Sequence, residues 1–174
     1  MRKGLIIVHT GNGKGKTTAA LGLAFRALGN GFKVCMIQFI KGTWKYGELK
    51  AAEKFENFEI IPMGKGFVNL GSEKPDPKDV EAAKDAFEKA KSVIFSNNYD
   101  MVILDEINYA ILYKLLDVDD VVEILKNKPE KLHVILTGRN AHEKIIEIAD
   151  LVTEMREIKH PFHKGIKAQR GIEF

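Results

Sequence analysis

The sequence predicts an α/β fold in which a mostly parallel β-sheet is sandwiched between layers of helices. Two observations support this expectation. Short, largely apolar stretches alternate along the chain with stretches whose apolar residues recur at helical spacing. Strands without polar alternation are typical of parallel sheets that are covered on both faces. Right-handed crossovers would then bring the loops that follow the strands to one edge of the sheet, where ligands of such sheets bind.

The apolar stretches define six expected strands. They lie at residues 5–8, 33–40, 58–63, 101–104, 133–136 and 151–158. Each stretch has a length typical of a strand and is too short for a long helix. The fourth of them, at residues 101–104, is entirely apolar and is followed directly by two acidic residues.

The segments between these strands define the expected helices. They lie at residues 19–24, 47–55, 79–95, 108–116, 118–126 and 141–149. The longest has the clearest helical period, which places Val80, Ala83 and Phe87 on one face. Residues 64–78 are rich in Gly, Pro and charge, so we expect a loop there. Residues 159–174 show no clear period.

The loop after the first expected strand is the most informative segment. Residues 10–18 read Thr-Gly-Asn-Gly-Lys-Gly-Lys-Thr-Thr between a strand and a helix, which is the context of a phosphate-binding P-loop. Thr10 stands where the usual pattern opens with Gly, but two glycines still supply backbone freedom. The residues expected to bind nucleotide are Gly11, Asn12, Gly13, Lys14, Gly15, Lys16, Thr17 and Thr18. The alternative is a glycine-rich turn with solvated lysines.

A P-loop attracts phosphate through its backbone N–H groups and the N-terminus of the helix that follows. Lys16 is then expected to reach the outer phosphates, and the Thr17 hydroxyl to bind Mg²⁺. The fold expectation therefore becomes a P-loop NTPase-like fold of the RecA-like type.

The two acids after the fourth strand are candidates for the same site. Asp105 and Glu106 end an apolar strand, and in P-loop proteins an acid at this place helps to hold Mg²⁺. One carboxylate and the Thr17 hydroxyl suffice, because Mg²⁺ keeps several waters. Which of the two acids binds is not readable from the sequence. The alternative is that they cap the next helix.

An arginine follows the fifth expected strand. Arg139 lies after Thr137 and Gly138, where it would neutralise charge that develops on phosphate oxygens. The alternative is a surface arginine that pairs with Glu143 four residues later.

Size and composition set further limits. The 174 residues fit a single domain, residues 1–174, and the net charge of +3 does not favour nucleic acid or a membrane surface as a partner. We find no apolar run of membrane-spanning length. The single Cys35 excludes an internal disulfide and is expected to be buried and inert, which suits a cytoplasmic location.

Several motifs together resemble one family. The P-loop at residues 11–18, residues 38–44, residues 101–106, residues 137–139 and the tail at residues 159–174 are similar, in matching order, to the P-loop type of ATP:corrinoid adenosyltransferase. Of these, the Gln-Phe-Ile-Lys-Gly-Thr-Trp segment and the Gly-Ile-Lys-Ala-Gln tail are the most specific.

The resemblance implies a reaction. In this family a corrinoid cobalt, reduced to Co(I), attacks the 5′ carbon of ATP, which makes adenosylcobalamin and releases tripolyphosphate. Lys16, Lys14 and Arg139, with Mg²⁺ (or Mn²⁺) on Thr17, are the residues expected to stabilise the departing triphosphate. Members of the family bind ATP reversed, with the loop around the outer phosphate.

The resemblance also implies a corrinoid face. Phe67 matches the aromatic residue of a family segment that lies beneath the corrin, but Asn69 replaces its tryptophan. Phe67 and Trp44 are the expected corrinoid contacts, and a core aromatic is the alternative for Phe67. Family members often carry a further segment before the first strand, and this chain begins almost at that strand, so we expect no lid from it.

Two other functions remain open at this point. One is a RecA-like NTP hydrolase or switch, in which Glu106 would orient a water. The other is a non-catalytic corrinoid carrier regulated by ATP. The resemblance also implies a homodimer. An external reductant such as a flavoprotein is expected, because a single cysteine does not provide a reductant within the protein.

Overall fold

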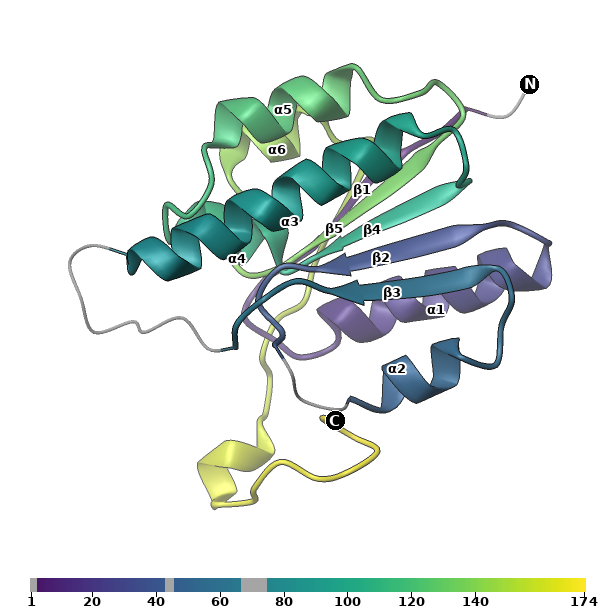
Figure 1. Ribbon diagram of the computed structural model, residues 1–174. Helices are drawn as coiled ribbons and strands as arrows, with labels where there is room; N and C mark the ends of the chain where they lie inside the picture. The colour runs from purple at the N-terminus through teal and green to yellow at the C-terminus, as the bar shows by residue number, and fades with distance from the viewer. Residues whose placement is uncertain (1–2, 43–45, 67–74) are drawn as a thin grey trace.

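A six-stranded sheet forms the centre of the protein in the computed structural model, which describes residues 3–42, 46–66 and 75–174. The strand order is β3-β2-β4-β5-β1-β6, and every neighbouring pair is parallel. Figure 1 shows the sheet between two groups of helices. The strands are β1 Ile6–Thr10, β2 Val34–Gln38, β3 Phe58–Pro62, β4 Met101–Asp105, β5 His133–Thr137 and β6 Leu151–Glu154.

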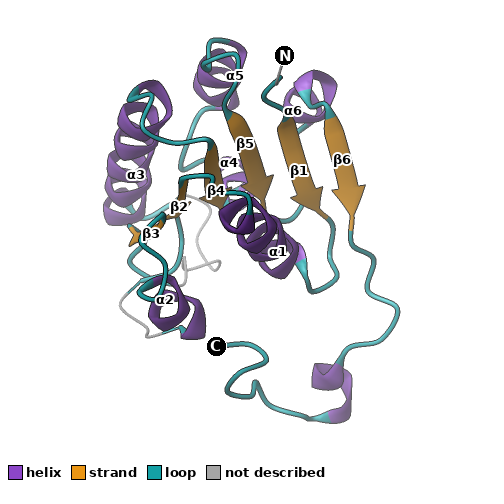
Figure 2. Cartoon of the chain, turned by 90° about the vertical axis from the view of Figure 1, so that its right-hand side faces the viewer, coloured by secondary structure: helices purple, strands orange, loops and turns teal. Residues whose placement is uncertain are grey.

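Each face of the sheet has its own helices and its own core. The helices are α1 Lys16–Gly29, α2 Gly47–Ala52, α3 Pro77–Phe95, α4 Ile107–Leu112, α5 Val118–Lys126 and α6 Glu143–Ile148. Because strand side chains alternate, Ile6 and Val8 pack with the α3–α6 layer while Ile7 packs with α1. Helices α1 and α2 lie together on the other side (Figures 1 and 2).

The predicted fold class is confirmed, and most element boundaries agree within a few residues. The expected sixth strand is too long: β6 ends at Glu154 instead of residue 158. Beyond it, the Met155 N–H still donates to the Thr10 carbonyl at 2.9 Å, and the chain then passes along the P-loop. The tail runs below the sheet with one short 3-10 helix, Pro161–Lys164, and ends near α2 (Figure 1).

Helix α3 begins two residues earlier than expected. Asp76 caps it by accepting a hydrogen bond from the Lys78 N–H at 2.8 Å, and Pro77 occupies the first helical position. Its buried residues form the apolar stripe that the sequence predicts, from Ala82 to Ile94. The cap and the proline lie in a stretch that composition alone assigns to a loop.

Cys35, the second residue of β2, is fully buried, as expected. Burial raises the pKa of its thiol to about 12, so the reactive thiolate is suppressed. Among the described residues, no helix combines the length and the apolar character that crossing a bilayer requires.

Two glycines offer a matched test of how closely the backbone packs. A Cβ on Gly4 would lie 2.0 Å from the Leu132 carbonyl oxygen, whereas a Cβ on Gly22, inside α1, would meet nothing within 4 Å. Gly4→Ala should cost about 1–3 kcal/mol, and Gly22→Ala should gain about 0.5–1 kcal/mol from helix propensity. Thermal unfolding of both variants measures this. A loss of stability in Gly22→Ala, or none in Gly4→Ala, would contradict the packing described.

Candidate functional site

The carboxyl ends of the strands bring the expected site residues to one edge of the sheet. β1 leads into the P-loop and β4 into Asp105 and Glu106, although β5 lies between these two strands. The P-loop therefore meets the acids across the end of β5, where Thr137 is buried. The strand order thus brings Asp105 together with Thr17, which lies 88 positions away in sequence, and with Thr137, which lies 32 positions away.

The first half of the P-loop is fixed by backbone contact with the segment after β6. Gly11 has φ 96°, and a Cβ there would lie 2.4 Å from the Met155 carbonyl oxygen. The Gly13 N–H donates to that same carbonyl at 2.7 Å. Only glycine combines this positive φ with so close an approach. Gly11 and Gly13 thus shape the loop, and the Gly13 N–H has an acceptor within the protein.

The second half of the P-loop opens directly into α1. Gly15 precedes the helix with φ 109° in the left-handed region, and no side chain caps the first turn. The first N–H groups of a helix have no intrahelical acceptor and carry partial positive charge. Lys16, Thr17 and Thr18, which form this turn, line a hollow in the surface. The helix end therefore presents donors suited to an anion.

The side chain of Lys16 is almost buried against the P-loop. Its Nζ donates to the Gly13 carbonyl at 2.8 Å, and its exposed fraction is 8%. Burial lowers the pKa of this ammonium. The negative charge of Glu106 partly offsets the decrease, and the positive charge of Arg139 adds to it. A partly desolvated cation of this kind interacts strongly with an incoming anion.

Asp105 is a fully buried carboxylate that joins three elements. Its Oδ1 accepts from the Thr17 hydroxyl at 2.8 Å and from the Thr137 hydroxyl at 2.8 Å. Its Oδ2 lies 3.4 Å from Nζ of Lys41. Thr17 thus contacts Asp105 rather than Glu106, which distinguishes the roles of the two acids.

Glu106 turns the chain from β4 into α4. It adopts a left-handed backbone with φ 64°, which is uncommon for a residue with a side chain. Its N–H donates to the Thr137 hydroxyl oxygen at 2.9 Å. Burial raises the pKa of the Glu106 carboxyl, and so does the neighbouring charge of Asp105. These two effects outweigh the decrease that the positive charges of Lys16 and Lys41 cause. Strained backbone of this kind gathers at functional sites.

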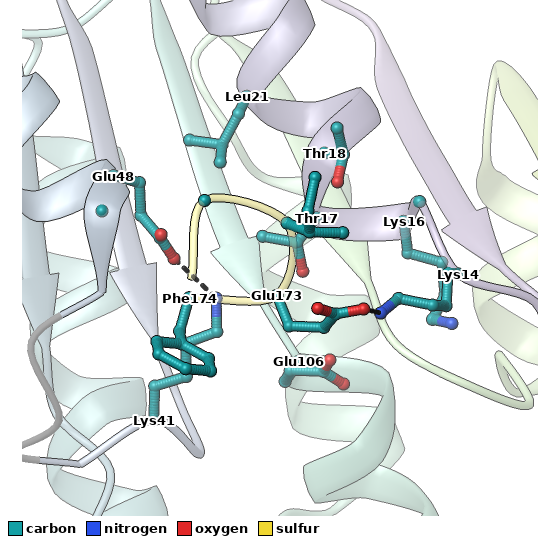
Figure 3. A pocket seen from close by; sticks show the side chains of 14 residues that line it. Lys14, Lys16, Thr17, Thr18, Leu21, Lys41, Glu48, Glu106, Glu173 and Phe174 are labelled. Carbon is teal, nitrogen blue, oxygen red and sulfur yellow. Dashed lines mark hydrogen bonds and ion pairs between the residues drawn. The ribbon is translucent and has the colours of Figure 1, made fainter. Parts of the chain in front are cut away.

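A phosphate hollow lies between the P-loop, α2 and the chain's own C-terminal tail (Figure 3). Its volume is about 440 Å³. The tail supplies one wall through residues 171–174, and the Glu173 carboxylate accepts a hydrogen bond from Nζ of Lys14. The hollow is lined by Lys14, Gly15, Lys16, Thr17, Thr18, Leu21, Lys41, Gly47, Glu48, Glu106, Gly171, Ile172, Glu173 and Phe174.

A second hollow of about 690 Å³ adjoins it, which we call the tyrosine hollow. Tyr109 of α4 and Tyr113, which directly follows that helix, lie with ring centroids 4.3 Å apart and share its wall with Arg139. The hollow is lined by Asn12, Lys16, Ile40, Lys41, Gly42, Tyr46, Lys65, Gly66, Glu106, Tyr109, Leu112, Tyr113, Arg139 and Asn140. Lys16, Lys41 and Glu106 line both hollows, so the two meet at these residues.

The structure brings most of the expected residues together. Lys14, Gly15, Lys16, Thr17, Thr18 and Glu106 line the phosphate hollow, and Asn12 and Arg139 the tyrosine hollow. Trp44, Phe67 and Asn69 lie outside the described residues. However, Gly42 and Tyr46, on either side of Trp44 in sequence, line the tyrosine hollow, and so does Gly66, which precedes Phe67.

Sequence reasoning missed four contributors. Lys41 follows β2 at the same edge as the acids, so its position after a strand is a signal that was available. Glu48 at the start of α2, Tyr109 on α4 and Glu173 in the tail give no comparable signal. Their places depend on how a short helix and an aperiodic tail pack against the sheet.

Together, the fold and this edge define an α/β protein whose P-loop borders a hollow lined by three lysines and three glutamates. Comparison with known proteins then identifies the family. The profile of ATP:corrinoid adenosyltransferase BtuR/CobO/CobP matches residues 2–174. The chain therefore belongs to the ATP:corrinoid adenosyltransferase family.

Curated relatives agree with this assignment. The chain is 50% identical to a corrinoid adenosyltransferase of Sinorhizobium sp, over 99% of this chain and 81% of that protein. It is 44% identical to the corrinoid adenosyltransferase of Escherichia coli K12 and 42% identical to corrinoid adenosyltransferase CobA of Salmonella typhimurium. Both matches cover 99% of this chain and 86% of the relative.

Solved structures share the fold at much lower identity. The flagellar accessory protein FlaH from Methanocaldococcus jannaschii superimposes with a TM-score of 0.58 at 17% identity, over 88% of this chain and 72% of that chain. The KaiC-like protein PH0186 from Pyrococcus horikoshii superimposes with a TM-score of 0.58 at 16% identity, over 90% of this chain and 75% of that chain. At this identity the likeness concerns the fold alone.

The two acids should respond oppositely to neutralisation. Asp105→Asn should lower stability by about 3 kcal/mol or more, because it removes one partner of a buried ion pair. Glu106→Gln should raise the melting temperature at pH 7, because the raised pKa means that folding disfavours the ionised carboxyl.

The sign of the Glu106 effect also sets its pH dependence. As pH falls through the raised pKa of the folded state, the Glu106 carboxyl of the parent becomes protonated and the parent gains stability. The difference in melting temperature between the parent and Glu106→Gln should therefore shrink. Thermal unfolding in a chelating buffer between pH 4 and pH 8 measures both variants. A Glu106→Gln variant that is less stable than the parent at pH 7 contradicts this assignment.

Proposed function

We propose that this chain transfers the 5′-deoxyadenosyl group of ATP to the Co(I) centre of a corrinoid and releases tripolyphosphate. The observation that carries the proposal is the direct junction of a phosphate-binding hollow with a larger hollow lined by aromatic side chains. A transfer from a triphosphate to a bulky acceptor requires two such sites in contact. Membership of the adenosyltransferase family supports the choice of acceptor.

The chemistry balances without a general base. Co(I) supplies the electron pair of the new Co–C bond, so the cobalt becomes formally Co(III). The C5′–O bond breaks, and its electron pair leaves on an oxygen of tripolyphosphate. Since the nucleophile is the metal of the substrate, the protein's task is to position the reactants and to stabilise the leaving anion.

Three cations suit that task. Lys16 lies at the helix N-terminus, partly desolvated, and is the main candidate to bind the triphosphate. Lys14 borders the same hollow and would exchange Glu173 for a phosphate oxygen. Arg139 lines the tyrosine hollow beside the junction and would offer its planar fork to phosphate.

The donor set also fits Mg²⁺ (or Mn²⁺). The Thr17 hydroxyl and the Asp105 carboxylate lie in contact and are hard oxygen ligands, which Mg²⁺ prefers. When bound, the ion would add positive charge against the triphosphate. Glu106 faces both hollows and is the second candidate to support it.

The tyrosine hollow is the proposed corrinoid side of the site. Phe67 and Trp44 remain the proposed corrinoid contacts, because their neighbours in sequence line this hollow. We further propose a cytoplasmic homodimer that receives electrons from an external reductant such as a flavoprotein. The buried and unreactive thiol of Cys35 supports an external electron source.

An assay of products tests the function. The protein is incubated with ATP, Mg²⁺ and chemically reduced cobalamin, and the phosphate products are separated. Adenosylcobalamin with equimolar tripolyphosphate is the expected result. ADP with phosphate would instead indicate a hydrolase or switch, and unchanged ATP with bound corrinoid would indicate a carrier.

Lys16→Ala should lower the rate of adenosyl transfer by about two orders of magnitude or more, the scale for removing one electrostatic stabiliser of a transition state. Lys126→Ala, an exposed lysine at the end of α5, is the matched control and should keep the parent's rate. The measurement is kcat/KM for ATP at saturating reduced corrinoid. Activity of Lys16→Ala within a few-fold of the parent would mean that the P-loop does not hold the reacting nucleotide.

A further inference from the structure

A lysine outside the P-loop lies where the two hollows meet. Lys16, Lys41 and Glu106 line both of them. Lys16 comes from the P-loop and Glu106 from the end of β4, so both belong to segments already assigned. Lys41 comes from the segment after β2 and supplies a second cation to the junction.

The backbone that carries Lys41 is held tightly on both sides. The Gly66 N–H donates to the Ile40 carbonyl at 3.0 Å, and a Cβ on Gly64 would lie 2.2 Å from the Ile40 carbonyl carbon. The Phe39 N–H donates to the Asp105 carbonyl at 3.0 Å. Neighbouring segments therefore fix the start of the side chain, as a positioned charge requires.

The side chain itself is directed by two acids. Nζ of Lys41 lies 2.9 Å from Oε1 of Glu48 and 3.4 Å from Oδ2 of Asp105, and only 18% of the side chain is exposed. Figure 3 shows the ends of the Lys41 and Glu48 side chains in contact at one side of the phosphate hollow. An ammonium that lies between two carboxylates is stabilised in its charged form, so this lysine remains a cation.

We propose that Lys41 is a catalytic cation that binds the triphosphate of ATP at the junction and stabilises it as it leaves. The inference rests on the proposed function, because it requires the nucleotide in one hollow and the acceptor in the other. The breaking C5′–O bond must then lie where the hollows meet. Its electron pair passes to the tripolyphosphate oxygen, and a fixed ammonium beside that oxygen stabilises the charge that develops.

Glu48 has a defined part in this arrangement. In the structure its carboxylate holds Lys41 at 2.9 Å, on the rim of the phosphate hollow. A triphosphate carries far more negative charge than one carboxylate and would draw the ammonium away from it. Glu48 is therefore a positioning residue that also competes with the nucleotide for Lys41.

A purely structural role makes a different prediction. Lys41 would then serve only as the counterion of buried Asp105. Its removal would lower stability and leave the affinity for polyphosphate unchanged. Affinity for inorganic tripolyphosphate, measured apart from turnover, therefore separates the two roles.

The test compares Lys41→Met with Lys50→Met, an exposed lysine in the last turn of α2 with the same change of charge. Calorimetric titration with inorganic tripolyphosphate and Mg²⁺ should show affinity reduced about tenfold or more in Lys41→Met, the scale of a hydrogen bond to a charged group. The turnover rate should fall about 100-fold. Lys50→Met should stay within twofold of the parent in both, and Lys41→Arg should recover most of the tripolyphosphate affinity.

A folded Lys41→Met variant that binds tripolyphosphate as the parent does would overturn the proposal. If Lys41→Met does not fold, Glu48→Gln decides, since it keeps the cation and removes its competitor. Tighter tripolyphosphate binding by Glu48→Gln supports the proposal, and equal or weaker binding overturns it. These results are distinct from failure of the proposed function, which the product assay of the parent reports through the absence of adenosylcobalamin.

Discussion

The buried carboxylate of Asp105 is the interaction on which the rest of the site depends. A charge with no exposure to water is tolerated only where hydrogen bonds and an opposite charge compensate for its lost hydration. The hydroxyls of Thr17 and Thr137 and the ammonium of Lys41 provide this compensation. They come from α1, β5 and the segment after β2, so meeting the needs of one carboxylate fixes three elements relative to β4.

The same interaction arranges the electrostatics of the two hollows. Thr17 is held at the helix N-terminus, where backbone donors face the phosphate hollow, and Lys41 is held at the junction. Glu106, the next residue, has a left-handed backbone, and it lines both hollows with a raised carboxyl pKa. Fixed charges of this kind need little reorganisation when a triphosphate arrives.

The tail adds a contact that the sheet does not supply. Most of residues 155–174 are exposed, yet residues 171–174 form one wall of the phosphate hollow, and Glu173 pairs with Lys14. Proteins with the same fold at 16–17% identity show that this scaffold occurs in chains that differ widely in sequence. In this chain, the segment after β2, α4 and the tail supply residues that line the two hollows beside the P-loop.

The sequence by itself determined the fold class, six strands and the P-loop, because these depend on local patterns: apolar runs, helical spacing and glycines next to lysines. It also singled out Asp105, Glu106 and Arg139, because parallel strands end at one edge. It did not separate the roles of the two acids. That required the strand order, which places β5 between β1 and β4 and sets Thr17 and Thr137 against Asp105.

Only the tertiary structure decided the places of Lys41, Glu48, Tyr109 and Glu173. The contacts of Lys41 with Glu48 and of Lys14 with Glu173 join residues 7 and 159 positions apart, and no local period records such a pairing. The end of β6 is a similar case, since the strand stops where its chain must pass the glycines of the P-loop. Local patterns specify the elements, whereas long-range packing and the compensation of buried charge specify which side chains meet.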